Sequence, residues 1–128
     1  DMHGMMRGIG AALLAVVSLF GLSACDDRGA RPEQFGGDPD HGKILIVQFG
    51  CGSCHAIPGI PDANGLAGPP LDNIGARTIV AGLLPNTPEN MIAWLKTPQS
   101  IVPGNAMPNM ELDDNGARDI AAYLYTLR

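Results

Sequence analysis

Residues 51–55 read Cys51, Gly52, Ser53, Cys54 and His55. Two cysteines separated by two residues and followed directly by histidine are the attachment signature of a c-type haem. The spacing has a chemical reason, because each thiol can add to one vinyl group of the porphyrin only if both thiols lie on one tight turn beneath it. The neutral imidazole of His55 is then next in line as an axial ligand of the iron. We therefore predict one covalent haem c per chain.

Two other uses of a cysteine pair fit the sequence less well. A closed zinc site needs four ligands, and only His55, His41 and Cys25 could complete the set. A thioredoxin-like redox dithiol requires strands that alternate with helices around the pair, and the sequence shows no such alternation. Haem attachment remains the favoured interpretation.

The first 24 residues are predicted to be an export signal. After Arg7 the chain is apolar and carries no further charge until Asp26. This apolar run is too short to be a comfortable transmembrane span. It ends in Leu22-Ser23-Ala24-Cys25, which resembles the lipobox of bacterial lipoproteins and predicts lipidation of Cys25. The alternative is an uncleaved anchor helix that ends in cysteine by chance, and either interpretation attaches the protein to a membrane.

Residues 25–40 are predicted to be a lipidated cysteine followed by a flexible tether. Glycine, proline and charged residues dominate this segment, so it cannot bury a core. Its reach as a flexible chain is roughly 20 Å. Asp26 resembles the signal that keeps lipoproteins at the inner membrane of two-membraned bacteria. We expect a periplasmic domain on the outer face of that membrane.

The remaining residues, 41–128, are predicted to form one small domain. A core of this size often needs a staple, and the haem would provide it. Capping residues and apolar spacing predict three main helices, with a further helical turn near Asn73 and no strand pair. The first helix is predicted at 41–49, with Asp40 as its N-cap. The second follows Thr87 as N-cap, has Pro88 as its first residue and is ended by Pro98. The third begins at Asp113 or Asp114. The predicted fold class is all-α.

Residues spread along this domain resemble the class I monohaem cytochromes c. The matching residues are Gly42, the 51–55 motif, Gly68-Pro69-Pro70-Leu71, Trp94-Leu95, Pro98, Pro103-Gly104, Met107-Pro108 and Ala122-Tyr123-Leu124. The resemblance implies the small class I cytochrome c fold, with three main helices and short helical turns wrapped around the haem. It also implies that the first and last helices cross near one haem edge. Gly42, Ile46, Ile120 and Tyr123 are expected at or near this crossing.

The resemblance further implies how the iron would be held. The backbone carbonyl of Pro69 would accept the second ring N–H of His55, as ligating histidines require. Met107 lies in a stiff loop between two prolines and would be the sixth ligand, a pairing that raises the reduction potential and closes the iron to small molecules. The alternatives for this position are Met110, Met91 and His41.

Two further residues are assigned by the resemblance. Arg77 lies where the family often places an arginine near a haem propionate, although an isolated arginine is usually a solvated surface group. Trp94 lies where relatives carry an aromatic residue over the methionine side of the haem, although ordinary core is the other interpretation. The family's usual tryptophan near the inner propionate has no counterpart around residues 84–87.

The predicted function is one-electron transfer rather than enzyme catalysis. Residues 1–24 contain one acidic residue, Asp1, and one basic residue, Arg7, so residues 25–128 keep the net charge of −5. This is not the basic surface of a soluble carrier that steers onto acidic docking sites. We expect redox partners in a quinol-oxidising complex, a haem-copper oxidase or both, and no nucleic acid. The alternatives are a haem enzyme or gas sensor with an open sixth position, or a structural haem subunit.

Overall fold

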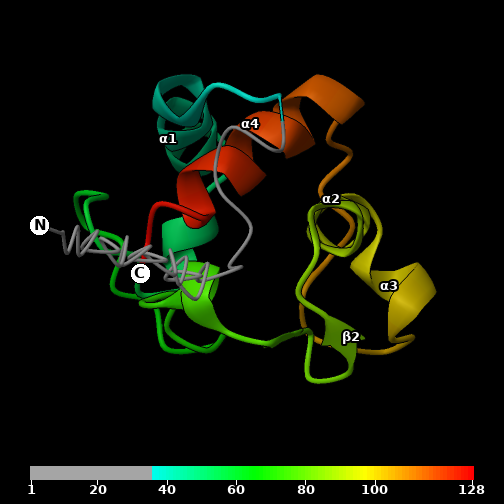
Figure 1. The fold of residues 1–128 in the computed structure, drawn as a ribbon. Coiled ribbons are helices and arrows are strands. Elements are labelled where there is room, and N and C mark those ends of the chain that lie inside the picture. Colours follow the sequence, from blue (N-terminus) through cyan, green and yellow to red (C-terminus); the bar gives the residue numbers. More distant parts are fainter. Residues whose placement is uncertain (1–35) are drawn as a thin grey trace, which may run out of the picture.

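The structure, a computed structural model, describes residues 36–128 (Figure 1). The predicted export signal, Cys25 and most of the tether lie outside the described residues. In chain order the elements are α1 (Pro39–Gln48), η2 (Cys51–Ser53), η3 (Ile74–Ala76), β1 (Ile79–Val80), β2 (Leu84–Pro85), α2 (Pro88–Lys96), α3 (Pro98–Ile101) and α4 (Asp114–Leu124). Among residues 36–128, no helix has the length and hydropathy needed to cross a bilayer. The predicted all-α class is confirmed.

Helix α1 begins two residues earlier than predicted. Its N-cap is Asp38, whose carboxylate accepts hydrogen bonds from the backbone N–H groups of Asp40 (2.9 Å) and His41 (3.3 Å). Pro39 occupies the first helical position, where its missing N–H and fixed φ are favourable. Asp40 therefore lies in the first turn of the helix, and its assignment as the N-cap is wrong.

The predicted N-cap of the second main helix and the predicted start of the third are correct. Thr87 caps α2 by accepting a hydrogen bond from the N–H of Asn90 at 3.2 Å, and Pro88 is the first helical residue. Asp113 caps α4 by accepting from the N–H of Gly116 at 2.7 Å. The starts of both helices are set by a local side-chain hydrogen bond, which is why the sequence predicts them.

Two small elements were not predicted. Strands β1 and β2 form an antiparallel pair in which Ile79 faces Pro85 and Val80 faces Leu84, so the expectation of no strand pair is wrong. Their connection includes Ala81 and Gly82, both with positive φ. Glycine adopts this conformation readily, but alanine seldom does, so only Gly82 indicates a turn in the sequence. Helix α3 starts at the proline that was expected only to end α2.

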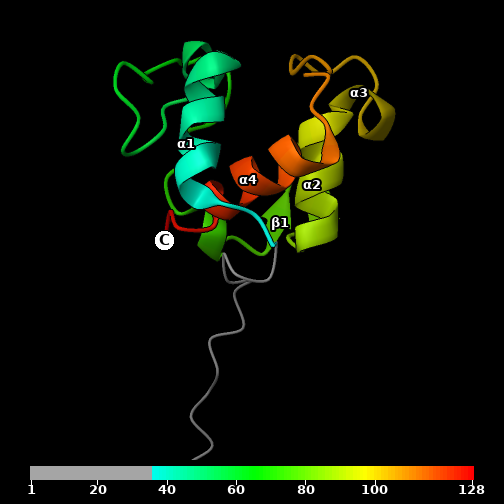
Figure 2. The same cartoon turned by 90° about the horizontal axis from the view of Figure 1, so that it is seen from above.

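Helix α4 lies between α1 on one side and α2 on the other (Figures 1 and 2). The approach to α1 is close because Gly42 has no side chain. A Cβ at this position would lie 1.9 Å from the carbonyl oxygen of Asp119. On the other side, Lys96 of α2 forms an ion pair with Asp114 at the start of α4, which lowers the pKa of that exposed carboxyl through a hydrogen bond and the lysine charge.

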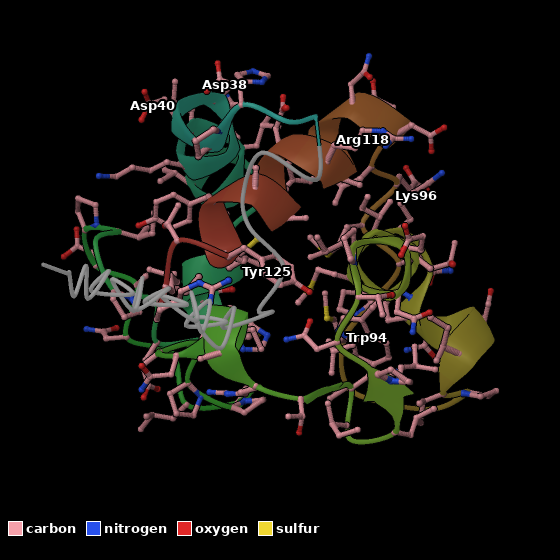
Figure 3. All side chains as sticks on the ribbon, viewed as in Figure 1. Asp38, Asp40, Trp94, Lys96, Arg118 and Tyr125 are labelled. Carbon is pink, nitrogen blue, oxygen red and sulfur yellow. The ribbon has the colours of Figure 1, made fainter. Side chains whose placement is uncertain are left out.

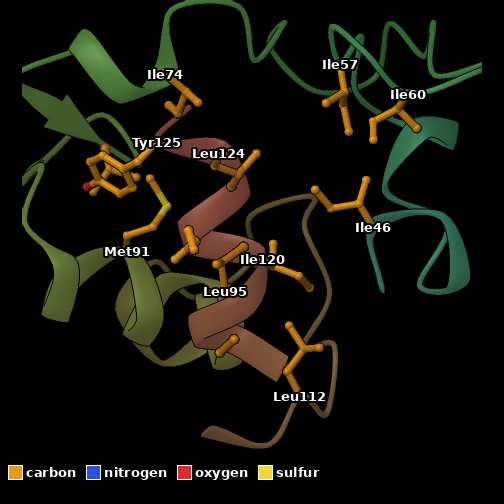
Figure 4. Packing of buried hydrophobic residues seen from close by; sticks show 14 residues of the cluster. Ile46, Ile57, Ile60, Ile74, Met91, Leu95, Leu112, Ile120, Leu124 and Tyr125 are labelled. Atoms are coloured by element: carbon orange, nitrogen blue, oxygen red, sulfur yellow. The ribbon is translucent and has the colours of Figure 1, made fainter. Parts of the chain in front are cut away.

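Helices α1, α2 and α4 each contribute side chains to the buried core (Figure 4). Ile46 of α1 and Ile120 of α4 are each only 1% exposed. Met91 of α2 lies close to Tyr125, which follows α4 and donates its hydroxyl hydrogen to the side-chain oxygen of Asn86. Burial, with a smaller contribution from the nearby acidic Glu89, raises the pKa of Tyr125 to about 12. The C-terminal residues are thus tied into the core.

The start of α1 is fixed to α4 through Asp119. Its carboxylate accepts the backbone N–H of Asp38 at 2.7 Å and pairs with Nδ1 of His41 at 2.6 Å. Desolvation raises the pKa of Asp119, but the hydrogen bonds from His41 and Asp38 outweigh it, so the net shift is downward. Asp38 is labelled at this end of α1 in Figure 3. The first turn of α1 is therefore held against α4 at one defined point.

Candidate haem site

A mostly apolar cavity of about 700 Å³ lies inside the domain. One part of its lining comes from the end of α1, η2 and the segment up to Leu71, and another from α2 and residues 102–112. Figure 2 shows these two parts of the chain on opposite sides of α4. The volume lies within the roughly 300–1,000 Å³ typical of cofactor sites. The cavity is thus enclosed by segments that are distant in sequence.

The 51–55 motif forms a tight turn on the wall of this cavity. Gly50 precedes it with a φ of +68°, a left-handed conformation that glycine adopts without strain. The carbonyl oxygen of Cys51 accepts hydrogen bonds from the N–H groups of Cys54 (3.2 Å) and His55 (3.0 Å). Both cysteines and His55 line the cavity, and the two sulfurs are not joined in a disulfide. Burial raises the pKa of the Cys51 thiol.

The ring of His55 is oriented by the backbone that follows it. Its Nδ1 lies 2.7 Å from the carbonyl oxygen of Pro69. A carbonyl can only accept, so Nδ1 carries the proton and Nε2 keeps a lone pair for a metal. A Cβ on Gly68 would lie 2.4–2.8 Å from three ring atoms, so this glycine allows the backbone to lie against the imidazole. The hydrogen bond expected from the resemblance is present.

Three methionines line the cavity: Met91, Met107 and Met110. Met91 is 1% exposed and belongs to the core cluster, as expected for a residue inside α2. Met107 and Met110 are half-buried and belong to the segment after α3. His41 is not among the lining residues and instead pairs with Asp119. The two loop methionines are therefore the better-placed candidates for a sixth ligand.

Trp94 and Arg77 also line the cavity. Trp94 is half-buried on α2 and is labelled in Figure 3. The guanidinium of Arg77 donates to the backbone carbonyls of Pro70 at 2.7 Å and Asp72 at 2.8 Å. It therefore fixes the segment that presents the Pro69 carbonyl to His55, a role that the sequence did not indicate.

Other residues that shape the site carry no motif. Asn86 donates to the carbonyls of Ile74 and Arg77, which connects the hairpin to the η3 turn. Gln99 and Asn105 bond to the backbone of the methionine-bearing segment. A single amide side chain has no characteristic spacing, so no sequence signal identifies these residues.

The lining residues fit a covalently bound haem. The wall is apolar, as a porphyrin plate requires, and two thiols lie on one turn beside an imidazole with a free Nε2. Among residues 36–128, no three His, Cys, Asp or Glu side chains are grouped so as to hold a metal ion on their own. Cys51, Cys54 and His55 are therefore the residues that would hold a haem here.

Comparison with known families agrees with this geometry. Residues 40–128 match the family described as Cytochrome c. The chain belongs to the cytochrome c family. Membership implies covalently bound haem c and the role of an electron carrier. The small all-α cytochrome c fold expected from the resemblance is confirmed.

This cytochrome c domain is similar to parts of longer proteins. It is 36% identical over 90 residues to cytochrome c oxidase subunit 2 of Alkalihalophilus pseudofirmus, an alignment that covers 70% of the chain and 25% of the relative. It is 38% identical over 91 residues to the Bacillus subtilis protein of the same name, with 68% and 26% covered. For the protein of that name from Bacillus sp. strain PS3 the identity is 32% over 87 residues, with 65% and 24% covered. The chain thus spans about a quarter of the length of these relatives.

Proposed function

We propose that this cytochrome c domain carries single electrons through one haem c attached to Cys51 and Cys54, with His55 and Met107 as axial ligands. The haem, when bound, supplies an iron that exchanges one electron between its ferric and ferrous states. Cys51 and Cys54 fix the plate by thioether bonds. His55 and Met107 would hold its iron, and ligation by Met107 would close the iron to small molecules.

The observation that carries this proposal is the hydrogen bond between His55 and Pro69. Nδ1 donates to the Pro69 carbonyl at 2.7 Å, so Nε2 is the nitrogen left for iron. The same bond increases the basicity of the imidazole and fixes its plane. Arg77 donates to the carbonyls of Pro70 and Asp72, so it also fixes the backbone that carries the Pro69 carbonyl.

Met107 is favoured as the sixth ligand because of where its segment lies. It comes from the part of the lining that Figure 2 shows across α4 from the 51–55 motif. Its N–H donates to the side-chain oxygen of Asn105 at 2.7 Å, and its carbonyl accepts from Gln99 at 2.7 Å. Both backbone groups of Met107 are thus fixed, whereas the backbone of Met110 makes no hydrogen bond within residues 36–128.

We further propose that the electron partners are a quinol-oxidising complex and a haem-copper oxidase. The similarity to subunit 2 of cytochrome c oxidases supports an association with a respiratory oxidase. The net charge of −5 suits a carrier that stays near its partners rather than one steered onto acidic sites. Lipidation of Cys25 and a tether between it and the start of α1 at Pro39 would keep the domain on the outer, periplasmic face of the inner membrane.

The ligand assignment is tested by absorption spectroscopy of Met107→Ala and Met110→Ala. Ferric cytochromes c with methionine ligation show a weak far-red band. We expect Met107→Ala to lose this band and its ferrous form to bind carbon monoxide. Met110→Ala is the matched control, since it removes a neighbouring half-buried methionine, and it should keep the band. Loss of the band in Met110→Ala alone would contradict the assignment, and a wild type that lacks the band and binds carbon monoxide would favour an enzyme or gas sensor.

The anchor and the partners are tested with the full chain. Cys25→Ser is expected to move the protein from the membrane fraction to the periplasmic fraction without changing its haem spectrum. In vesicles that contain a haem-copper oxidase, the wild-type protein should sustain oxygen consumption when it is reduced. Retention of Cys25→Ser in the membrane after loss of residues 1–24, checked by mass, would contradict the lipid anchor, and no electron transfer to the oxidase would contradict the partner.

A further inference from the structure

Gln99 makes an unusual number of hydrogen bonds to one short segment. Its side-chain NH₂ donates to the carbonyl oxygens of Asn105 (2.8 Å) and Met107 (2.7 Å), and its side-chain oxygen accepts from the N–H of Gly104 at 3.0 Å. Its own backbone N–H donates to the side chain of Asn109 at 3.2 Å. One half-buried amide in α3 therefore bonds to residues on both sides of Met107.

The segment lies largely at the surface, where few side chains can fix its backbone. Pro103, Gly104, Ala106, Pro108 and Asn109 are exposed, and no strand pairs with them. Gly104 has a φ of +80°, so the chain turns sharply here. Backbone groups that turn at the surface are ordinarily free to exchange with water. Gln99 replaces that freedom with three bonds of good length.

Asn105 extends the same arrangement. Its side chain accepts from the N–H of Met107 at 2.7 Å and donates to the carbonyls of Pro98 (3.1 Å) and Val102 (2.6 Å). Asn105 thus connects Met107 to the two ends of α3, and its own backbone N–H donates to the carbonyl of Val102 at 3.2 Å. The carbonyls of Asn105 and Met107 are the backbone groups that Gln99 holds, so removing Gln99 would release both carbonyls.

We propose that Gln99 is the positioning residue for Met107. It holds the 104–107 backbone so that the thioether faces the cavity, and it thereby sets how readily another ligand takes the sixth position. The inference rests on the proposed ligation by Met107. Gln99 itself contacts backbone only and would not touch the haem.

The test compares Gln99→Leu with Gln99→Glu in the haem-loaded protein. Leucine fills a similar volume without hydrogen bonds, and glutamate keeps the acceptor for Gly104 while losing both donor bonds. Imidazole serves as the probe, titrated into the ferric protein. We expect both variants to bind it about tenfold or more tightly than wild type, because losing two hydrogen bonds in Gln99→Glu and three in Gln99→Leu corresponds to at least that factor. The far-red band should weaken and the reduction potential should fall.

Asn90→Leu is the matched control. Its side-chain NH₂ donates to the carbonyl of Pro85 at 2.9 Å, so the variant also removes an amide bond to a loop, but one away from Met107. Hydrogen exchange of the Gly104 amide supplies a reading independent of the iron. This amide should exchange faster in Gln99→Leu and at the wild-type rate in Asn90→Leu.

The outcomes separate this inference from the proposed function. If wild type and Met107→Ala bind imidazole equally well, the ligation by Met107 fails. If Met107→Ala differs from wild type but both Gln99 variants bind imidazole as wild type does, Gln99 has no positioning role. A lower melting temperature with unchanged imidazole affinity would likewise show a merely structural residue. Should Gln99→Leu not fold, the affinity of Gln99→Glu decides.

Discussion

Replacing Gly42 with alanine tests the helix crossing that frames the cavity. A Cβ at residue 42 would lie 1.9 Å from the carbonyl oxygen of Asp119 and 2.9 Å from the backbone nitrogen of Ile120. The closest ordinary carbon–oxygen contacts are about 3.3 Å, so α1 and α4 must separate locally by about 1.4 Å. The atoms at that contact belong to the backbone of α4, which cannot rotate away as a side chain could. The added methyl must therefore displace a whole helix.

The magnitude follows from the packing on either side of Gly42. A gap of this size removes a quarter to a half or more of the dispersion attraction between facing side chains such as Ile46 and Ile120. Overpacking of this kind costs about 1–3 kcal/mol and occasionally more, and alanine returns up to about 1 kcal/mol through its helix propensity. We expect a net loss of about 2 kcal/mol in the free energy of unfolding. For a domain of this size that lowers the melting temperature by roughly 8–16 °C.

The assay is thermal and guanidinium unfolding of the haem-attached protein, followed by far-ultraviolet circular dichroism and by fluorescence of Trp94, the single tryptophan. Gly116→Ala is the matched control, because it makes the same substitution inside α4 where the nearest atom is a side-chain oxygen at 3.1 Å. It should be nearly neutral. A Gly42→Ala variant as stable as wild type, or a Gly116→Ala variant equally destabilised, would refute the close approach at residue 42.

Three further predictions concern single contacts. Asp38→Ala should lower the unfolding free energy by about 1 kcal/mol through loss of the α1 cap, whereas Asp40→Ala should cost less, and the reverse order in urea unfolding would contradict the assigned cap. The pKa of Asp119 is lowered because its hydrogen-bond donors outweigh desolvation, so it stabilises the fold above its unfolded pKa and this contribution is lost as the pH falls through its folded pKa. Asp119→Asn should flatten that acid limb of the stability curve, and an unchanged curve would count against the bond network. Tyr125 has a pKa of about 12 in the fold against 10.0 ordinarily, so its contribution to the stability of the wild type should be lost as the pH rises from 10 through 12. Tyr125→Phe should lack this alkaline loss and should be about 1 kcal/mol less stable at neutral pH. Equal losses of stability at alkaline pH in the two proteins would contradict the raised pKa.

The sequence predicts those features whose cause is local. Thr87 and Asp113 are followed by helical residues and cap them, so their helices begin where expected. The 51–55 motif was predicted as a tight turn, and it forms one directly after Gly50, which takes a positive φ. At α1 two aspartates flank Pro39, and local chemistry allows either to cap. The choice of Asp38 also brings its N–H to Asp119, a contact 81 residues away that the local sequence does not reveal.

The remaining features depend on tertiary contacts. Ala81 takes a positive φ in the β1–β2 connection, a conformation that its side chain does not favour. Gln99 gains its partners only after α3 folds back on the segment that follows it. Arg77, expected at a propionate, bonds to the backbone carbonyls of Pro70 and Asp72. Such roles arise when an irregular segment folds back on a neighbouring side chain, and composition and spacing do not predict that path.

The central claim is that residues 51–55 carry a haem through two thioether bonds. Mass spectrometry of the purified chain, followed by digestion and sequencing of the peptide that contains Cys51 and Cys54, tests it most directly. We predict that this peptide gains the mass of one haem, that the gain maps to both cysteines, and that Cys51→Ala with Cys54→Ala abolishes it. A peptide with two unmodified thiols from protein made in a cell that matures cytochromes c would contradict the account.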